Sequence, residues 1–264
     1  MTETAASKSE NTDILSADAV KNLLSGDFSG EIIVKDVTDS TNADAARIAK
    51  TAPHGTVIIA DAQTAGRGRL GKSFFAPKGG IYMSVILRLN LAFSDAVLVT
   101  TAAAVSVCKA VEAVSDVRPQ IKWVNDLLVE GKKVCGISCE AVSAGEMIDA
   151  VILGVGINFS AQEFPEELRD TAGALFVKPP VTRSVLIAEI LKNLLAETED
   201  LASRKFIEDY RTRSAVLGKP IRYLENGVWH DAEAVEIDEN GGLVIAENGI
   251  GKTLVSGEIT LRIA

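Results

Sequence analysis

Apolar residues follow helical or alternating spacing along most of this chain, and the pattern predicts its secondary structure. Helical spacing predicts helices over residues 13–24, 43–52, 96–114, 185–202 and 206–213. Alternating or continuously apolar runs predict strands over residues 31–37, 56–60, 81–89, 119–124, 127–129, 134–141 and 147–159. Helices and strands are therefore interleaved through the first four fifths of the chain.

The region after residue 216 has a different pattern. Short β-rich segments alternate there with Asn-Gly turns at residues 226–227, 240–241 and 248–249, which predicts a small β-barrel. We therefore expect three regions. They are a polar tail and short helix over residues 1–30, a larger domain over residues 31–215 and the barrel domain over residues 216–264.

Composition and charge narrow the function. The chain has 264 residues, of which 47% are hydrophobic, and a net charge of −9, so we expect a folded globular protein. No run approaches the roughly 20 apolar residues of a membrane span, and the N-terminus has no secretory apolar region. These features predict a cytoplasmic protein with no membrane partner. The acidic balance argues against general nucleic-acid binding, so we expect no DNA partner.

The cysteines and histidines favour neither a zinc site nor a catalytic triad. Cys135 and Cys139 are four residues apart, but His54 and His230 lie far from them in sequence, so we expect reduced, structural thiols. We expect His54 in a turn and His230 on the surface. A reaction without a protein nucleophile is favoured, and activation of a carboxylate by ATP is one that fits.

The most distinctive segment is residues 63–72, which reads QTAGRGRLGK directly after the apolar run 56–60. Glycines permit tight turns, and guanidinium groups bind phosphate or carboxylate. The segment lacks the Gly-Lys-Ser/Thr ending of a Walker sequence, and no βαβ unit follows it. It therefore predicts an anion-binding loop of another kind, with a basic surface turn as the alternative.

Three further segments carry polar residues that a core does not need. Ser40-Thr41-Asn42 is a ligand-binding candidate, although a helix cap also explains it. Lys122 to Asp126 places a lysine in an apolar strand, where an anion or a solvent-facing position would explain it. Gly154 to Asn158 allows close backbone approach, or forms a simple strand-end turn.

Taken together, five segments in order resemble the motifs of biotin protein ligases. The family pattern is Asp-Ser-Thr-Asn, Gln-x-x-Gly-Arg-Gly-Arg-x-Gly, Lys-Trp-Pro-Asn-Asp, Lys-x-x-Gly-Ile and Gly-x-Gly-Ile-Asn. The matching segments here are residues 39–42, 63–71, 122–126, 133–137 and 154–158. The resemblance covers residues 31–264. Three positions depart from the family: Val124 replaces the usual Pro, Phe74 stands where many members have Trp, and Cys135 replaces Gly or Ala.

The resemblance implies a two-step reaction and assigns residues to it. Biotin and ATP, with Mg²⁺ carried by the ATP, would give biotinyl-5′-AMP, and the acyl group would pass to a lysine of a biotin carboxyl carrier protein or domain. The implied biotin-binding residues are Ser40, Thr41, Asn42, Gln63, Arg67, Gly68, Arg69, Lys133, Gly136 and Ile137. The implied nucleotide-binding residues are Arg67, Arg69, Phe74, Lys122, Asn125 and Asn158, and the implied catalytic residues are Arg69, Lys133, Lys122 and Asp126.

The family also implies a fold and a set of partners. The expected fold is of the α/β (α+β) class, with a mixed, largely antiparallel sheet flanked by helices and an SH3-like C-terminal barrel. Only about 30 residues precede the first predicted strand, so we expect a ligase without the DNA-binding domain of some relatives. A homodimer through a sheet edge is consistent with the family. Two alternatives remain open, a lipoate or octanoyl transferase and a non-catalytic biotin-binding or carrier-docking module.

Overall fold

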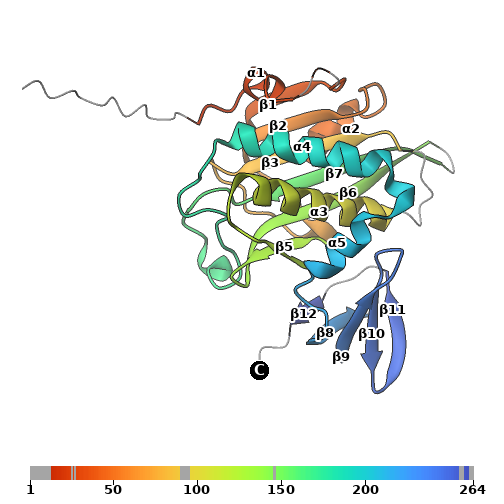
Figure 1. Ribbon diagram of the computed structural model, residues 1–264. Helices are drawn as coiled ribbons and strands as arrows, with labels where there is room; N and C mark the ends of the chain where they lie inside the picture. Colours follow the sequence, from red (N-terminus) through yellow and green to blue (C-terminus); the bar gives the residue numbers. More distant parts are fainter. Residues whose placement is uncertain are drawn as a thin grey trace, which may run out of the picture.

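A computed structural model describes residues 13–24, 26, 28–89, 96–144, 147–255 and 259–261. Its larger part is built on a seven-stranded sheet with the order β1-β2-β3-β7-β6-β5-β4 (Figure 1). The strands are β1 (Ile32–Thr38), β2 (Thr56–Gln63), β3 (Ile81–Leu87), β4 (Gln120–Lys122), β5 (Asp126–Val129), β6 (Lys132–Ala144) and β7 (Met147–Ile157). The expected mixed, largely antiparallel sheet is confirmed, because only the β1–β2 pair is parallel.

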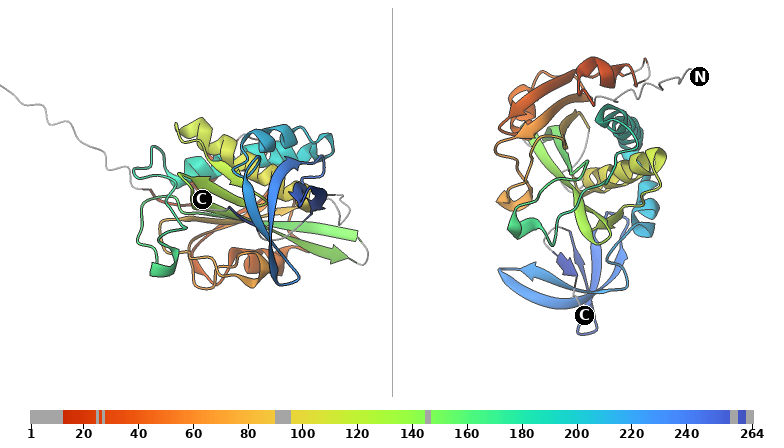
Figure 2. Two further views of the ribbon diagram at one scale, coloured as in Figure 1. Left: turned by 90° about the horizontal axis from the view of Figure 1, so that it is seen from below. Right: turned by 90° about the vertical axis from the view of Figure 1, so that its left-hand side faces the viewer.

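Helices cover both faces of this sheet. Helix α2 (Thr41–Ile48) connects the parallel strands β1 and β2 and packs on one face. The other face carries α3 (Ala96–Val114), α4 (Arg183–Glu199) and α5 (Phe206–Thr212), as the view along the sheet shows (Figure 2). The sheet is thus buried on both sides over its central strands, which explains why β3 is a continuous apolar run rather than an alternating one.

Helix α3 corrects one expectation about membranes. By length and composition alone, its window Val97–Val114 is apolar enough to span a bilayer, contrary to the expectation that no segment comes close. In the structure 72% of that window is buried inside the protein, between the sheet and helices α4 and α5. Such burial is the property of a core helix, whose apolar side chains pack on protein.

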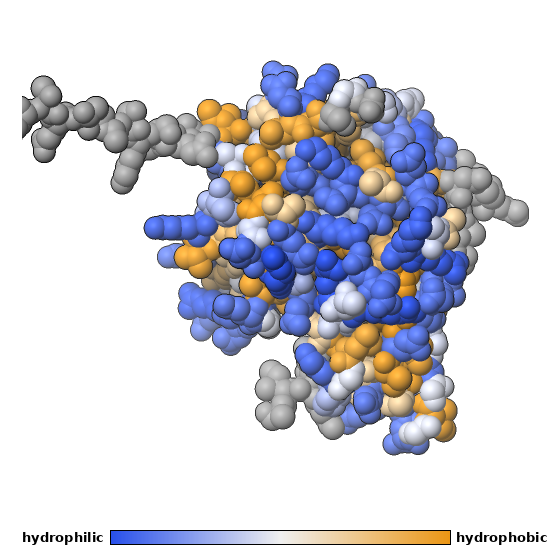
Figure 3. All heavy atoms as spheres, in the orientation of Figure 1, coloured by the Kyte–Doolittle hydropathy of each residue, from blue (hydrophilic) through white to orange (hydrophobic). Residues whose placement is uncertain are grey.

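The C-terminal region forms a second, five-stranded antiparallel sheet with the order β11-β10-β9-β8-β12. Its strands are β8 (Pro220–Glu225), β9 (Val228–Ile237), β10 (Leu243–Glu247), β11 (Ile250–Leu254) and β12 (Ile259–Leu261). The Asn226-Gly227 and Asn248-Gly249 turns have positive φ at both residues, as two-residue hairpins require. Val228 in β9 and Ile250 in β11 are exposed. Apolar side chains also gather on the face of this sheet that Figure 3 shows.

The N-terminal segment is part of the larger domain rather than a separate region. Helix α1 (Ala17–Lys21) is shorter than the predicted helix over residues 13–24, and Ser16 caps its N-terminus. Val20 is fully buried in the main core, where α1 packs against β1 and α4. Asp13 also binds Arg183 at the start of α4, with 2.6 Å between Arg183 Nε and Asp13 Oδ2. Residues 13–24 therefore pack on the larger domain, although the predicted boundary lies at residue 31.

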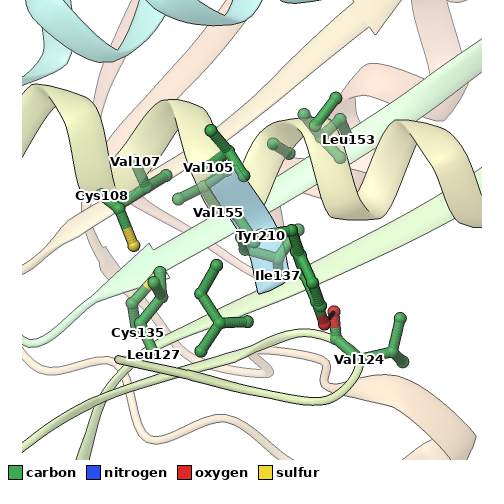
Figure 4. Close-up of a cluster of buried hydrophobic side chains, with 14 of the residues drawn as sticks. Val105, Val107, Cys108, Val124, Leu127, Cys135, Ile137, Leu153, Val155 and Tyr210 are labelled. Carbon is green, nitrogen blue, oxygen red and sulfur yellow. Dashed lines mark hydrogen bonds between the residues drawn. The ribbon is translucent and has the colours of Figure 1, made fainter. Parts of the chain in front are cut away.

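The two sheets are joined through the turn between β4 and β5. The indole nitrogen of Trp123 donates to the carbonyl oxygen of Gly241 in the β9–β10 loop at 3.0 Å. The hydroxyl of Tyr210 in α5 donates to the carbonyl oxygen of Val124 at 3.1 Å. Tyr210 lies in the buried cluster between α3 and the sheet (Figure 4), and this burial raises the pKa of its hydroxyl well above the usual value. The turn is therefore held by a helix and by the second sheet.

A buried charge cluster at the start of α4 generates a prediction about stability. The Arg183 side chain is 8% exposed and bonds Asp13, Asp61 and the carbonyl oxygen of Gly80. Replacing Arg183 with alanine would remove this partner from two partly buried carboxylates and from the carbonyl oxygen of the buried Gly80, so we expect Arg183→Ala to lower the free energy of unfolding by about 3 kcal/mol in urea titrations. Lys205→Ala removes the exposed pair with Asp200 and should cause no measurable change. Equal effects of the two substitutions would contradict this account.

Candidate active site

The predicted site residues converge on one side of the sheet, where α2 begins, β2 ends and strands β6 and β7 pass beneath. One pocket is lined by most of them: Ser40, Thr41, Asn42, Gln63, Arg67, Gly68, Arg69, Phe74, Asn125, Lys133, Gly136 and Ile137. The remaining predicted residues, Lys122, Asp126 and Asn158, line an adjoining cavity of about 380 Å³ that shares Phe74 and Lys133 with the pocket. The structure thus forms two connected compartments.

Residues 40–42 act both as a helix cap and as the pocket wall. Ser40 is the N-cap of α2 and accepts a hydrogen bond from the backbone nitrogen of Ala43 at 3.4 Å. The backbone nitrogen of Thr41 donates to Gln63 Oε1 at 2.8 Å, which ties the helix start to the end of β2. All three residues of the Ser-Thr-Asn segment are buried. The helix-cap interpretation is therefore confirmed for Ser40, and the same three residues also line the pocket.

The glycine-arginine loop is closed by its own backbone hydrogen bonds. Gly68 N donates to the carbonyl oxygen of Lys72 at 2.7 Å, and Phe74 N donates to that of Gly66 at 2.9 Å. A Cβ at position 66 would lie 2.5 Å from the carbonyl oxygen of Phe74, so the loop can close only with glycine there. This geometry carries Arg67 and Arg69 over the pocket.

Arg69 and Asn125 connect this loop to the β4–β5 turn. Arg69 Nη1 donates to Asn125 Oδ1 at 3.0 Å, and Asn125 Nδ2 donates to the carbonyl oxygen of Ile137 at 2.7 Å. The backbone nitrogen of Ile137 in turn donates to the carbonyl oxygen of Asn125 at 2.9 Å. Asn125 therefore fixes the distance between the loop and β6.

Lys133 and Asp126 form an ion pair where the two compartments meet. Lys133 Nζ lies 2.6 Å from Asp126 Oδ1 and 5.9 Å from the centre of the Phe74 ring. Both side chains are partly exposed, at 35% and 23%, so Lys133 can exchange Asp126 for an anion that enters the pocket. Lys133 is the second residue of β6, directly after the tight Glu130-Gly131 turn.

Three glycines of β6 and β7 make room for these side chains. A Cβ at Gly136 would lie 3.0 Å from Lys133 Cε, and one at Gly156 would lie 2.7 Å from the Phe74 ring. A Cβ at Gly154 would lie 2.4 Å from Asn42 Oδ1 and 2.6 Å from Ser138 Oγ. The prediction that the Gly154–Asn158 segment allows close approach is confirmed. The atoms that lie close to these glycines belong to side chains of the site.

Asn158 is fixed by backbone groups. Its Nδ2 donates to the carbonyl oxygens of Gly173 at 3.0 Å and Lys133 at 3.4 Å. Its Oδ1 is buried and has no hydrogen-bond partner among the residues that the structure describes. A donor on a ligand in the adjoining cavity would satisfy that oxygen.

Sequence reasoning missed a second layer of polar residues beneath the pocket. Asn42 Nδ2 donates to Glu140 Oε1 at 2.6 Å and to Ser138 Oγ at 3.1 Å. Ser84 Oγ lies 2.6 Å from Asn42 Oδ1 and is fully buried in β3. A lone serine within the apolar run of β3 was the one available signal, because a buried hydroxyl needs a partner.

The described residues contain no group of three or more His, Cys, Asp or Glu side chains that could hold a metal ion. Burial raises the pKa of the Cys139 thiol to about 11, and burial also raises the pKa of the Cys135 thiol well above its usual value, so both remain protonated and inert. His54 lies in a turn as expected. His230 does not lie free on the surface: it is half-buried, stacks on Tyr223 at 5.1 Å and contacts Glu247 at 3.1 Å.

A larger cavity, of about 870 Å³, lies elsewhere and contains none of the predicted site residues. It is bounded by α4 and by the chain around Phe28 and Gly55. Two cations line it. Arg88 is already bonded to the carbonyl oxygens of Ala49 and Ala52 and to Asp149, and Lys192 is paired with Glu189. The chemistry of the chain is concentrated in the two smaller compartments.

Comparisons with known proteins match a protein family over the part of the chain that forms the site. Residues 34–158, which carry nearly all of the site, match the model of the Biotin/lipoate A/B protein ligase family. The bifunctional ligase/repressor BirA of Bacillus spizizenii is 34% identical over 241 residues, 87% of this chain and 74% of that protein. The chain belongs to this family.

Two further relatives of the ligase family are similar over most of their length. The biotin–[acetyl-CoA-carboxylase] ligase of Paracoccus denitrificans is 34% identical over 224 residues, which cover 79% of this chain and 91% of that protein. The biotin protein ligase of Aquifex aeolicus, solved in complex with biotin and ATP, superposes with a TM-score of 0.75 at 29% identity. That match covers 88% of this chain and 99% of the other, and therefore includes both sheets.

The close approach at Gly154 gives a prediction for the pocket. Gly154→Ala would push Asn42 and Ser138 out of their hydrogen bonds, so we expect the free energy of unfolding to fall by about 2 kcal/mol. Gly251→Ala, in a strand position with no heavy atom within 4 Å of the added Cβ, should change it by less than about 0.5 kcal/mol. Chemical denaturation of both variants measures the difference, and an equal response would show that position 154 has space for a side chain.

Proposed function

We propose that this protein is a biotin protein ligase. It activates biotin with ATP to biotinyl-5′-AMP and transfers the biotinyl group to a specific lysine of a biotin carboxyl carrier protein or domain. The observation that carries this proposal is the division of the site. Neutral hydrogen-bonding groups lie at one end of the pocket, and cations lie at the other, around the junction of the compartments.

The neutral end favours biotin over the lipoyl group. Biotin carries a cyclic urea, which offers two N–H donors and one carbonyl acceptor. The buried side chains of Ser40, Thr41 and Asn42 and the partly buried side chain of Gln63 supply matching acceptors and donors. The dithiolane ring of lipoate would leave these polar groups unpaired at a cost in binding free energy.

The cationic end fits the carboxylate and the phosphates. Arg67, Gly68 and Arg69 would close over the acyl chain and the adenylate, with Gly136 and Ile137 below. The nucleotide would extend into the adjoining cavity, which Phe74, Lys122 and Asn158 line. Asn125 lines the pocket from which the nucleotide would enter this cavity. Four cations at one site in a chain of net charge −9 support a substrate with several negative charges.

The first step follows from this arrangement. A carboxylate oxygen of biotin attacks the α-phosphorus of ATP, the new oxygen–phosphorus bond forms, and pyrophosphate leaves. Lys133 moves from Asp126 to the oxygens that gain charge at the α-phosphorus, and Arg69 and Lys122 stabilise the same charge. A closed loop over the adenylate excludes water, which would otherwise hydrolyse it.

The second step forms an amide. The acceptor lysine nitrogen attacks the acyl carbon, and AMP leaves. Asp126, once Lys133 has turned to the substrate, would be available to orient the ammonium group of the incoming lysine and to accept a proton from it.

The donor set fits a metal brought by the nucleotide. Asp126 and Asp170 both line the adjoining cavity, and Asp126 lies there beside Lys133; Mg²⁺ commonly uses one or two carboxylates plus substrate phosphates. Asp126 would hold the ion, which would neutralise phosphate charge when bound. The proposal also includes a cytoplasmic location, which the three free cysteines support. It includes an absence of DNA binding, which the net charge of −9 supports, and a homodimer through the β1 edge of the sheet.

Exchange of labelled pyrophosphate into ATP tests the proposal directly. We expect exchange that depends on biotin and is absent with lipoate or octanoate. Exchange with lipoate alone would show that the protein activates lipoate rather than biotin. A rise in melting temperature with biotin, but no exchange with any of the three acids, would make it a binding module.

Lys133 and its neighbour Lys132 form a matched pair for the catalytic assignment. Lys133→Ala removes the cation at the junction of the compartments, so we expect the rate of biotin-dependent pyrophosphate exchange to fall about 100-fold. Lys132 points away and donates to the carbonyl oxygen of Arg169 at 3.0 Å, so Lys132→Ala should keep the rate within about twofold. Normal exchange by the Lys133→Ala variant would refute the role of that residue.

A further inference from the structure

The glycine-arginine loop lies within a long connection between β2 and β3. These strands are antiparallel neighbours whose ladder ends at the pair Ala60 and Tyr82, and residues 64–80 connect them. Connections longer than roughly 15 residues are uncommon in compact domains and are usually functional. The pocket beneath the loop has a volume of about 50 Å³, whereas ligand pockets typically measure roughly 300 Å³ or more. The loop must therefore move when a substrate enters or leaves.

The last four residues of this connection, residues 77–80, form the stem of the loop. They read Pro-Lys-Gly-Gly, and two adjacent glycines leave many backbone conformations accessible. Two side chains from outside the loop hold these glycines. Gly79 N donates to Asp61 Oδ1 at 3.3 Å, and Arg183 Nη1 donates to the carbonyl oxygen of Gly80 at 3.1 Å. The stem is therefore fixed by side chains of β2 and α4 that bond its backbone.

Arg183 connects the two ends of the loop. Its Nη1 also donates to Asp61 Oδ1, and Asp61 lies in β2 just before the loop begins. The same guanidinium group thus bonds the strand from which the loop leaves and the stem by which it returns. Burial alone would raise the pKa of Asp61, but hydrogen bonds from Arg183 and Gly79 lower it below its usual value, so this carboxylate is ionised at neutral pH.

The guanidinium group is itself held in place from a third direction. Arg183 Nε donates to Asp13 Oδ2 at 2.6 Å, and the backbone nitrogen of Arg183 donates to Asp13 Oδ1 at 2.9 Å. The side chain is 8% exposed, so it has little freedom to follow a moving stem. Arg183 is therefore a fixed point against which the loop closes.

We propose that Arg183, together with Asp61, is a positioning residue that holds the glycine-arginine loop closed over the pocket. Neither side chain lines the pocket or the adjoining cavity, so both act through the loop. Without the Asp61 carboxylate, Gly79 and Arg183 lose the acceptor that they share, and the stem gains other conformations. The loop then opens more often. The consequence for substrate rests on the proposed function: biotin and the adenylate leave the open site faster.

Trypsin cleavage of the unliganded protein tests the position of the loop without any substrate. Cleavage of a native loop depends on how often the loop opens. We expect Asp61→Ala to raise the rate of cleavage within residues 64–80 roughly tenfold, the effect of losing a charge-assisted hydrogen bond. Cleavage after the exposed Lys205 should change less than twofold. The positions at which trypsin can cut the loop are Arg67, Arg69, Lys72 and Lys78.

Two conservative substitutions separate the hydrogen bonds from the charges. Asp61→Asn keeps an oxygen that accepts from both Gly79 and Arg183, so loop cleavage should stay within about threefold of the wild-type rate. Arg183→Lys keeps the positive charge but lacks the planar fork that bonds Asp61 and Gly80 together. We expect Arg183→Lys to accelerate loop cleavage as Asp61→Ala does.

Glu197→Ala is the matched control for the loss of a partly buried carboxylate. The Glu197 side chain is 18% exposed and pairs with Lys109 at 2.8 Å, near the opposite end of α4 from Arg183. It has no contact with the loop stem, so loop cleavage should stay within twofold of the wild-type rate. Faster loop cleavage in this variant would show that any loss of stability opens the loop.

The dissociation rate of labelled biotin, measured after a chase with unlabelled biotin, connects the loop to the substrate. We expect roughly tenfold faster dissociation from Asp61→Ala and a rate within twofold of the wild type from Glu197→Ala. Faster loop cleavage with an unchanged dissociation rate would overturn the role of the clamp in substrate retention.

The outcomes separate this inference from the proposed function. Unchanged loop cleavage in both Asp61→Ala and Arg183→Lys, or equal acceleration at the loop and at Lys205, overturns the role of Arg183. A wild-type protein that binds biotin but exchanges no pyrophosphate overturns the proposed reaction, while the cleavage rates still decide the role of Arg183.

Discussion

The backbone register between β6 and β7 is the constraint on which the site depends. It places Gly136 opposite Gly156 and Ser138 opposite Gly154, so that two glycine positions of β7 lie under the pocket. A shift of one residue would turn every side chain of a strand to the other face of the sheet. Phe74 and Asn42 would then meet side chains instead of bare backbone. The long pairing of these two central strands makes such a shift costly. This pairing therefore determines which atoms surround the pocket.

The distribution of charge follows a similar logic. The chain is acidic, yet arginine and lysine line its binding compartments, and Asp126 there is paired with Lys133. Asp126 holds Lys133 until an anion arrives, which keeps the lysine near the junction without burying an unpaired charge. The same side chain can therefore be placed in advance and still be released when substrate binds.

Much of the fold was accessible from the sequence, because periodicity is strong in the long elements. Helix α3 has the predicted bounds. The Gly154–Asn158 and 63–72 segments both contribute residues to the lining of the pocket. Local patterns could not show what depends on distant contacts. The helix over residues 13–24 was overextended because its spacing continues beyond the turn that Ser16 caps, and the packing of Val20 on the main core has no local signal.

The site shows the same division. The motif residues carry visible chemistry, but Ser84, Ser138 and Glu140 are ordinary strand residues until strand pairing brings them to Asn42. The separation into two compartments could not be predicted from the sequence either, because it depends on the positions of Phe74 and Lys133 in space. Residues that contact a ligand have distinctive sequence contexts, whereas residues that orient those contacts are defined by the tertiary structure alone.

The link between Trp123 and Gly241 has a consequence for how this chain can be divided. The indole donor is buried in the first domain, but its acceptor belongs to the second, at a glycine with φ of +77° that also packs against α3. A catalytic domain expressed alone would carry an unsatisfied buried donor directly beside Asn125. The C-terminal sheet of another ligase could replace this one only if its loop offered a carbonyl at the same point. The two sheets are therefore separate in topology, but this hydrogen bond makes them a single unit when the chain is divided or when domains are exchanged between ligases.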